Sequence, residues 1–120
     1  MTDERGMKTS ELTGAALDWA VAKCEEVGDS WFFQFYEGDE EDGIPPEFHY
    51  STDWALAGLI IEQECIAISC LGVTGYTPDT WHAQHPKRAF ARGKTPLIAA
   101  MRCYVASKLG DEVQLPEGVQ

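Results

Sequence analysis

The spacing of apolar residues predicts a helix over residues 95–110. Four positions, each four residues apart, would form its buried face: Leu97, Met101, Val105 and Leu109. Thr95 and Pro96 suit the first positions of a helix, and Gly110 suits the residue that ends one. Arg102 and Lys108 fall outside this apolar face.

A second helix is predicted over residues 12–28. Thr13 can cap its N-terminus, and Gly28 can end it. Its buried face would consist of residues at helical spacing: Leu17, Ala20, Val21 and Cys24. The two amphipathic helices therefore lie near opposite ends of the chain.

Three short segments between these helices are predicted to form strands. Residues 31–36 are rich in aromatic side chains, residues 65–71 alternate and contain β-branched residues, and residues 80–84 form a shorter third segment. Residues 37–46 combine acids with Gly and Pro, which predicts a solvated loop. Residues 85–94 are polar and basic, and we expect a loop that leads into the last helix.

The segment that follows residue 48 has two interpretations. Ser51, Thr52 or Asp53 could cap a short helical turn that begins near Trp54. Gly58 interrupts the pattern, so a turn or a broken helix explains the segment equally well.

The predicted order is helix, strand, strand, strand, helix. We therefore expect an α+β fold in which two amphipathic helices pack on a small antiparallel sheet of about three strands. A chain of 120 residues is long enough for one domain with its own core. We place that domain at residues 8–115, after a disordered leader at 1–7, with an acidic loop at about 37–47 and a tail at 116–120.

Charge is unevenly distributed along the chain. The net charge is −11, and the segment 24–86 contains 13 acids but neither Lys nor Arg. The segment 87–108 contains six basic residues and no acid. An overall charge this negative opposes binding to nucleic-acid phosphates, so we expect no direct nucleic-acid binding. A local anion site in the basic segment is still compatible with this negative net charge.

Three stretches of the chain resemble a known family. The sequences KTSELTGAALDWAVAK at 8–23, STDWALAGLIIEQECI at 51–66 and TPLIAAMRCYVASKLGDEV at 95–113 are similar to the NinX-like family of phage and prophage proteins. The family's central motif has a further Gly and a Pro where this chain has Ala57, Gly58 and Leu59. The resemblance implies a small accessory protein of unknown function, expressed inside a bacterium. It supplies no catalytic residues.

The first candidate site is an anion site at the start of the last helix. It would use the basic and capping residues of that region: Arg88, Arg92, Lys94 and Thr95. Free N–H groups at a helix N-terminus with nearby cations suit a phosphate or a carboxylate. The letters GKT at 93–95 do not make a phosphate-binding loop, because Arg88 stands where that motif needs a Gly. The alternative is a solvated basic loop that faces the protein's own acidic surface.

Other chemistry is weakly supported by the sequence. Asp53 and Trp54 could line a pocket, although Asp is also a good helix cap and Trp a good core residue. The spacings of His82 with His85 and of Cys65 with Cys70 are not those of zinc sites. The cysteines form no C-x-x-C pair, and we expect them to be reduced and partly buried. We expect neither a metal nor a cofactor, and no catalytic motif appears.

These observations favour a non-enzymatic accessory protein that binds a host protein or a small anionic ligand. The alternative is an acidic decoy, a nucleic-acid mimic whose basic-free segment binds a basic host protein. No apolar run is long enough to span a membrane, and the charged N-terminus lacks a signal core, so we expect the bacterial cytoplasm. The five aromatics among residues 31–36 also make a homo-oligomer possible.

Overall fold

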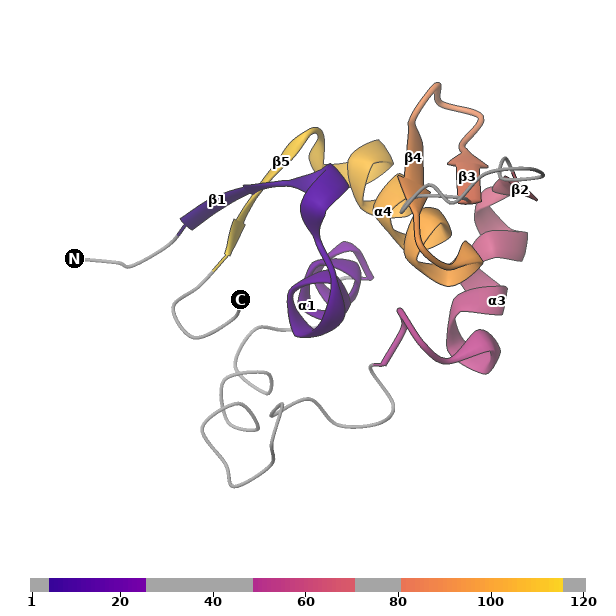
Figure 1. The fold of residues 1–120 in the computed structure, drawn as a ribbon, viewed down its shortest axis with the longest axis horizontal. Helices are drawn as coiled ribbons and strands as arrows, with labels where there is room; N and C mark the ends of the chain where they lie inside the picture. Colours follow the sequence, from indigo (N-terminus) through magenta and orange to yellow (C-terminus); the bar gives the residue numbers. More distant parts are fainter. Residues whose placement is uncertain (1–4, 26–48, 71–80, 116–120) are drawn as a thin grey trace.

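The computed structural model describes residues 5–25, 49–70 and 81–115 (Figure 1). In chain order the elements are β1 (Arg5–Lys8), a short 3-10 helix η1 (Thr9–Glu11), α1 (Gly14–Cys24), α3 (Trp54–Glu64), β2 (Ala67–Cys70), β3 (Trp81–Gln84), β4 (Phe90–Gly93), α4 (Pro96–Leu109) and β5 (Glu112–Leu115). None of the described helices is long and apolar enough to cross a membrane.

Helix α4 is the centre of the fold. It packs along one face of the antiparallel sheet β2-β3-β4 and also contacts α1 and α3 (Figure 1). A second sheet pairs β1 with β5. The structure therefore confirms an α+β fold with a small antiparallel sheet of three strands, and adds a third helix and a second small sheet. Helix α4 packs along the three-stranded sheet, whereas α1 packs on α4 and β5.

The predicted ends of α4 are confirmed. The Thr95 hydroxyl oxygen accepts the Ile98 N–H at 3.1 Å, Pro96 is the first helical residue, and Gly110 takes a φ of 88° at the C-terminus. The predicted apolar positions are buried except for Leu109, which is half-buried. Arg102 is also buried although it falls outside that face, because the helix is covered on more than one side.

Helix α1 is shorter than the predicted segment 12–28. It begins after Thr13, whose side chain makes no capping bond, and ends at Cys24. Asp18 is buried on this helix, and its Oδ1 accepts the Ser51 N–H at 2.8 Å. This bond fixes the segment that enters α3 against α1.

Helix α3 runs through Gly58 without a break, so the interpretation as a turn or a broken helix is wrong. Asp53 caps the helix by accepting the Ala55 N–H at 2.9 Å, and Cys65 ends it in a left-handed conformation with a φ of 58°. Of the residues in α3, only Ala57 and Ile60 are buried. Caps at both ends thus offset the destabilising effect of the mid-helix glycine.

The predicted strands at 65–71 and 80–84 are confirmed as β2, which begins at Ala67, and β3, while residues 71 and 80 lie outside the described residues. The loop predicted over 85–94 is confirmed for residues 85–89 and wrong for residues 90–93, because Phe90–Gly93 forms β4 and pairs with β3. Residues 91 and 93, which face α4, are small, so the segment lacks the alternation of large apolar residues that indicates a strand. A Cβ on Gly93 would lie 2.6 Å from the Ala99 nitrogen, which explains why this position has no side chain.

The leader predicted over residues 1–7 is wrong for residues 5–7. These residues belong to β1, in which Met7 pairs with Val113 of β5. Just after β1, the Thr9 hydroxyl donates to the Gly110 carbonyl oxygen at 2.6 Å, which adds a further contact between the segments that flank β1 and β5. The predicted strand at 31–36, the acidic loop at 37–47 and the tail at 116–120 lie outside the described residues.

Candidate ligand-binding site

Two residues from separate predicted sites, Trp54 and Thr95, line the same pocket. The pocket lies between the first turns of α3 and α4 and has a volume of about 230 Å³. Its lining comes from the two helix starts: Ser51, Thr52, Trp54, Thr95, Pro96 and Leu97. The Trp54 side chain is 56% exposed, so its ring borders the opening and does not fill the core.

Most backbone donors at these helix starts are already used. In α4, Pro96 has no N–H, and Thr95 accepts the N–H groups of Ile98 and Ala99. The first turn of α4 therefore offers at most the Leu97 N–H to a ligand. Asp53 consumes the first donors of α3 in the same way, by accepting from Ala55, Leu56 and Ala57. The helix dipoles still favour a negative charge here.

Ser51 is a buried serine in the lining of the pocket. Ser51 is 4% exposed, and its backbone N–H is held by Asp18. Among the described residues, no group forms a hydrogen bond with the Ser51 hydroxyl. A buried hydroxyl without a partner is destabilising, and a polar ligand atom would remove that penalty.

The predicted basic residues fall into two groups. Arg92 and Lys94 are exposed and immediately precede Thr95, although neither lines the pocket. In the described part of the chain, no ion pair or hydrogen bond holds either side chain. Both cations are therefore close in sequence to Thr95 of the pocket lining and are not held by another described side chain.

Arg88 lies at the other end of β4, away from Thr95. It closes the turn between β3 and β4, where its N–H donates to the His85 carbonyl oxygen at 2.9 Å. Its φ of 69° is left-handed, a conformation that favours Gly. The predicted set Arg88, Arg92, Lys94 and Thr95 is thus not one cluster. Asp53, the partner predicted for Trp54, is a helix cap outside the pocket lining.

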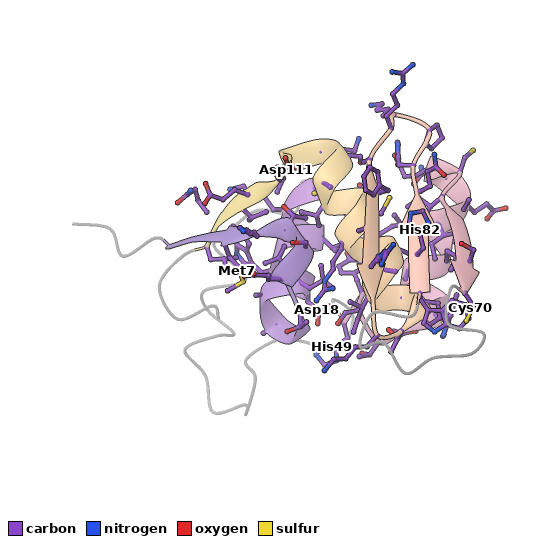
Figure 2. The ribbon with its side chains drawn as sticks, turned by 45° about the horizontal axis from the view of Figure 1, so that its top comes forward. Met7, Asp18, His49, Cys70, His82 and Asp111 are labelled. Carbon is purple, nitrogen blue, oxygen red and sulfur yellow. The ribbon has the colours of Figure 1, made fainter. Side chains whose placement is uncertain are left out.

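A second concave region borders the turn that holds Arg88. Two adjoining pockets of about 340 and 330 Å³ share Phe90, Ala106 and Asp111 in their linings. Asp111 lies just past the C-terminal end of α4 (Figure 2). Phe90 is 69% exposed, on the same sheet face as His82, and the two ring centroids lie 6.1 Å apart. Sequence reasoning missed this groove because β4 was predicted to be a loop.

His85 is used inside the fold. Its Nδ1 accepts the Lys87 N–H at 3.0 Å, and its Nε2 lies 2.8 Å from Glu64 Oε1. Because Nδ1 is an acceptor, the proton on Nε2 is the one donated to Glu64. This bond is the main reason why the pKa of the Glu64 carboxyl lies below its usual value. Across the described ranges, no three His, Cys, Asp or Glu side chains gather in a way that could hold a metal ion.

A sequence comparison identifies the family. The model of a phage family, described as bacteriophage P22 NinX, matches residues 8–108. The chain belongs to the NinX family. The NinX match extends over α1, α3 and α4, so it includes both helix starts that form the pocket. No curated protein matches the chain.

Proposed function

We propose that this NinX-family protein is a non-enzymatic accessory protein of a phage that binds a small anionic ligand between the N-termini of α3 and α4. The observation that supports this proposal is the shared pocket of Trp54 and Thr95, whose lining includes the buried Ser51, a residue with no hydrogen bond to its hydroxyl from the described part of the chain. The protein would act inside the bacterial host that expresses the phage genes.

The pocket dimensions restrict the ligand. A volume of about 230 Å³ is below the range of roughly 300 to 1,000 Å³ that encloses most small molecules. The pocket would therefore enclose only part of the ligand. A flat apolar group suits the Trp54 ring and the Pro96 and Leu97 side chains. The anionic group would stay at the opening, near Arg92 and Lys94. A nucleotide combines these two parts.

Polar contacts would orient the ligand. The Ser51 and Thr95 hydroxyls can each donate one hydrogen bond, since the Thr95 oxygen acts as acceptor in its cap. The Leu97 N–H supplies one further donor. These contacts favour an oxygen-rich ligand and give the two cations a steering role.

The test begins with native mass spectrometry of protein purified without added ligand. Adenosine monophosphate is then titrated by calorimetry as the probe. We expect Arg92→Ala/Lys94→Ala to weaken binding about tenfold or more, a loss of about 1.4 kcal/mol. Lys87→Ala/Arg88→Ala is the matched control, because it removes the same charge at the other end of β4, and it should bind within about threefold of the parent.

Trp54→Ala and Ser51→Ala test the enclosed part of the ligand. Both should weaken binding of the same probe without changing the spectrum of the folded protein. Equal loss in the Arg92/Lys94 and Lys87/Arg88 variants would show a general charge effect and would contradict a site at the helix starts. Unchanged binding in Trp54→Ala would place the site elsewhere.

The alternative function, an acidic decoy for a basic host protein, stays a prediction. Residues 26–48 hold eight of the 13 acids in the basic-free segment, and they lie outside the described residues. A host-lysate pull-down at low and high salt separates the two functions. A decoy would lose its partner steeply as salt rises, because exposed charges are screened.

A further inference from the structure

Among the described strands, β4 lies at an edge of its sheet, and its register with β3 determines its hydrogen-bond pattern. The sheet order is β2-β3-β4, so β3 pairs with only one side of β4. The His85 N–H donates to the Ala89 carbonyl oxygen at 2.7 Å, which makes these residues a bonded pair. Bonded and non-bonded pairs alternate in an antiparallel ladder. Phe90, which lies opposite Gln84, is therefore in a non-bonded pair and points its N–H and C=O away from β3.

A side chain occupies part of this open edge. Arg92, opposite His82, is also in a non-bonded pair, so its backbone N–H and C=O point away from β3. Its carbonyl oxygen accepts a hydrogen bond from Arg102 Nη1 at 2.8 Å. No hydrogen bond within the described ranges holds the Phe90 N–H or C=O. The free edge of β4 is thus closed at Arg92 and open at Phe90.

The open edge faces a groove. The two adjoining pockets that contain Phe90 lie between β4, the segment Lys8–Ser10 and the C-terminal end of α4. Their volumes of about 340 and 330 Å³ leave room beside the strand. An extended chain entering this space could use both backbone groups of Phe90 in one bonded pair.

Charge distinguishes the two ends of the groove. Lys87 and Arg88 lie at the hairpin end, where β4 begins. Asp111 lies beyond the end of α4 and lines both pockets, whereas Glu112 lines the other pocket together with Lys8. The pocket at the hairpin end therefore holds two cations and one acid, and the other pocket holds one cation and two acids. Arg88 keeps its charged side chain at this end although its φ of 69° is a conformation that favours Gly.

We propose that the groove binds an extended, acidic segment of a partner protein, which adds as a strand antiparallel to β4. In this direction the partner chain runs toward the hairpin end. Its acidic side chains therefore follow the residue that pairs with Phe90 and lie near Lys87 and Arg88. This surface is separate from the pocket at the helix starts, so either proposal can fail without the other.

The test uses a synthetic peptide, Thr-Val-Thr-Val-Thr-Glu-Glu with an amidated C-terminus, on the full-length protein. We expect saturable binding by NMR titration at millimolar peptide or below, weakened by added salt. The Phe90 N–H should exchange with solvent about tenfold more slowly in the complex, and the Ala91 N–H, already bonded to β3, should not change. A peptide ending in Lys-Lys should bind at least about tenfold more weakly.

Variants separate the charge contacts from the backbone contacts. Lys87→Glu/Arg88→Glu should reverse the preference, so that the Lys-Lys peptide binds more tightly than the Glu-Glu peptide. Phe90→Ala removes a side chain that lines both pockets but keeps the backbone groups, so the peptide should bind more weakly while the N–H of residue 90 is still protected in the complex. Lys94→Ala, which lies outside β4, should bind within about threefold of the parent. Absence of binding at millimolar peptide, or binding without protection of the Phe90 N–H, would overturn the proposal.

Discussion

The Arg102 side chain donates from Nε to the Leu12 carbonyl oxygen at 2.7 Å, across 90 positions of the chain. Its Nη1 donates to the Arg92 carbonyl oxygen as well. One buried guanidinium thus connects α4 to the start of α1 and to β4. A planar group with several fixed donors can do this, whereas an ammonium is a single point of charge.

We predict that Arg102→Met destabilises the protein by about 2–4 kcal/mol, because two carbonyl oxygens lose a charged donor inside the fold. Arg102→Lys should recover less than half of that loss. Urea unfolding followed by circular dichroism measures both. Lys94→Met removes the same charge from an exposed side chain and should stay within about 0.5 kcal/mol. Similar losses in both positions would contradict the connecting role of Arg102.

Two glycines should respond to Ala in opposite directions. At Gly93 a Cβ would lie 2.6 Å from the Ala99 nitrogen, so Gly93→Ala should destabilise by about 1–3 kcal/mol through overpacking against α4. At Gly58 a Cβ would meet no atom within 4 Å, so Gly58→Ala should stabilise α3 by about 0.5–1 kcal/mol. Thermal unfolding of the two variants measures both changes in stability. Destabilisation by Gly58→Ala would show that α3 has a close neighbour on that face.

The left-handed residues Arg88 and Cys65 predict stabilising substitutions. Arg88→Gly and Cys65→Gly should each raise the free energy of unfolding by about 1 kcal/mol, because Gly adopts a positive φ without a steric penalty. Lys87→Gly, one residue earlier and not left-handed, should have no such benefit. Arg88→Gly should also lose binding of the acidic peptide, so stability and binding would change in opposite directions at one residue.

The bond between His85 and Glu64 predicts a pH-dependent contribution to stability. The pKa of Glu64 is lower in the folded protein than in the unfolded chain, mainly because of the His85 hydrogen bond. Such a carboxyl stabilises the fold at pH values above its unfolded pKa of about 4.3, and this stabilisation is lost as the pH falls through the folded pKa.

Glu64→Gln should therefore be less stable than the parent at pH 7, and the difference should shrink as the pH falls below about 4. Urea titrations at pH 7 and pH 3 measure the two differences. Glu62→Gln, an exposed position on the same helix, is the control and should show no such trend. A difference of the same size at both pH values would rule out the carboxylate as its cause.

The four thiols should divide into two classes of reactivity. Burial raises the pKa of Cys24 to about 12 and that of Cys103 to about 11, so these thiols are almost entirely protonated near neutral pH. Cys65 and Cys70 are exposed, which corrects the expectation of partial burial for these two. An aromatic disulfide reagent at pH 7.5 should label two thiols rapidly and the others only after unfolding. Cys65→Ser/Cys70→Ser should remove the rapid phase.

The sequence predicts those elements whose signals are local. Both ends of α4 carry their own capping residues, and the helix is found at the predicted position. The sequence pattern does not indicate the strand β4, because the residues that face α4, Ala91 and Gly93, are too small to give an alternation of large apolar side chains. The strand β1 could not be predicted for another reason. Its partner β5 lies at the other end of the described chain, so no local signal indicates the pairing.

The candidate site, like the fold, could be predicted only where the signal lies in the local sequence. Trp54 and Thr95 could each be selected from local sequence, but only the packing of α3 on α4 makes them neighbours. Arg88 and Thr95 are close in sequence, and the extended strand between them separates the two. Ser51 appeared in the sequence as a possible cap, and its buried hydroxyl depends on the contact of its backbone with Asp18.

The pairing of β1 with β5 also sets a condition on synthesis. A ribosome releases β1 before α1 and β5 only after α4, so the first strand has no partner while the rest of the domain is made. The Thr9–Gly110 hydrogen bond, which joins residues 101 positions apart, must form equally late. Closing such a large loop is slow compared with helix formation. The two-stranded sheet therefore forms only after α4 and β5 have been synthesised, and until then β1 stays available to other chains.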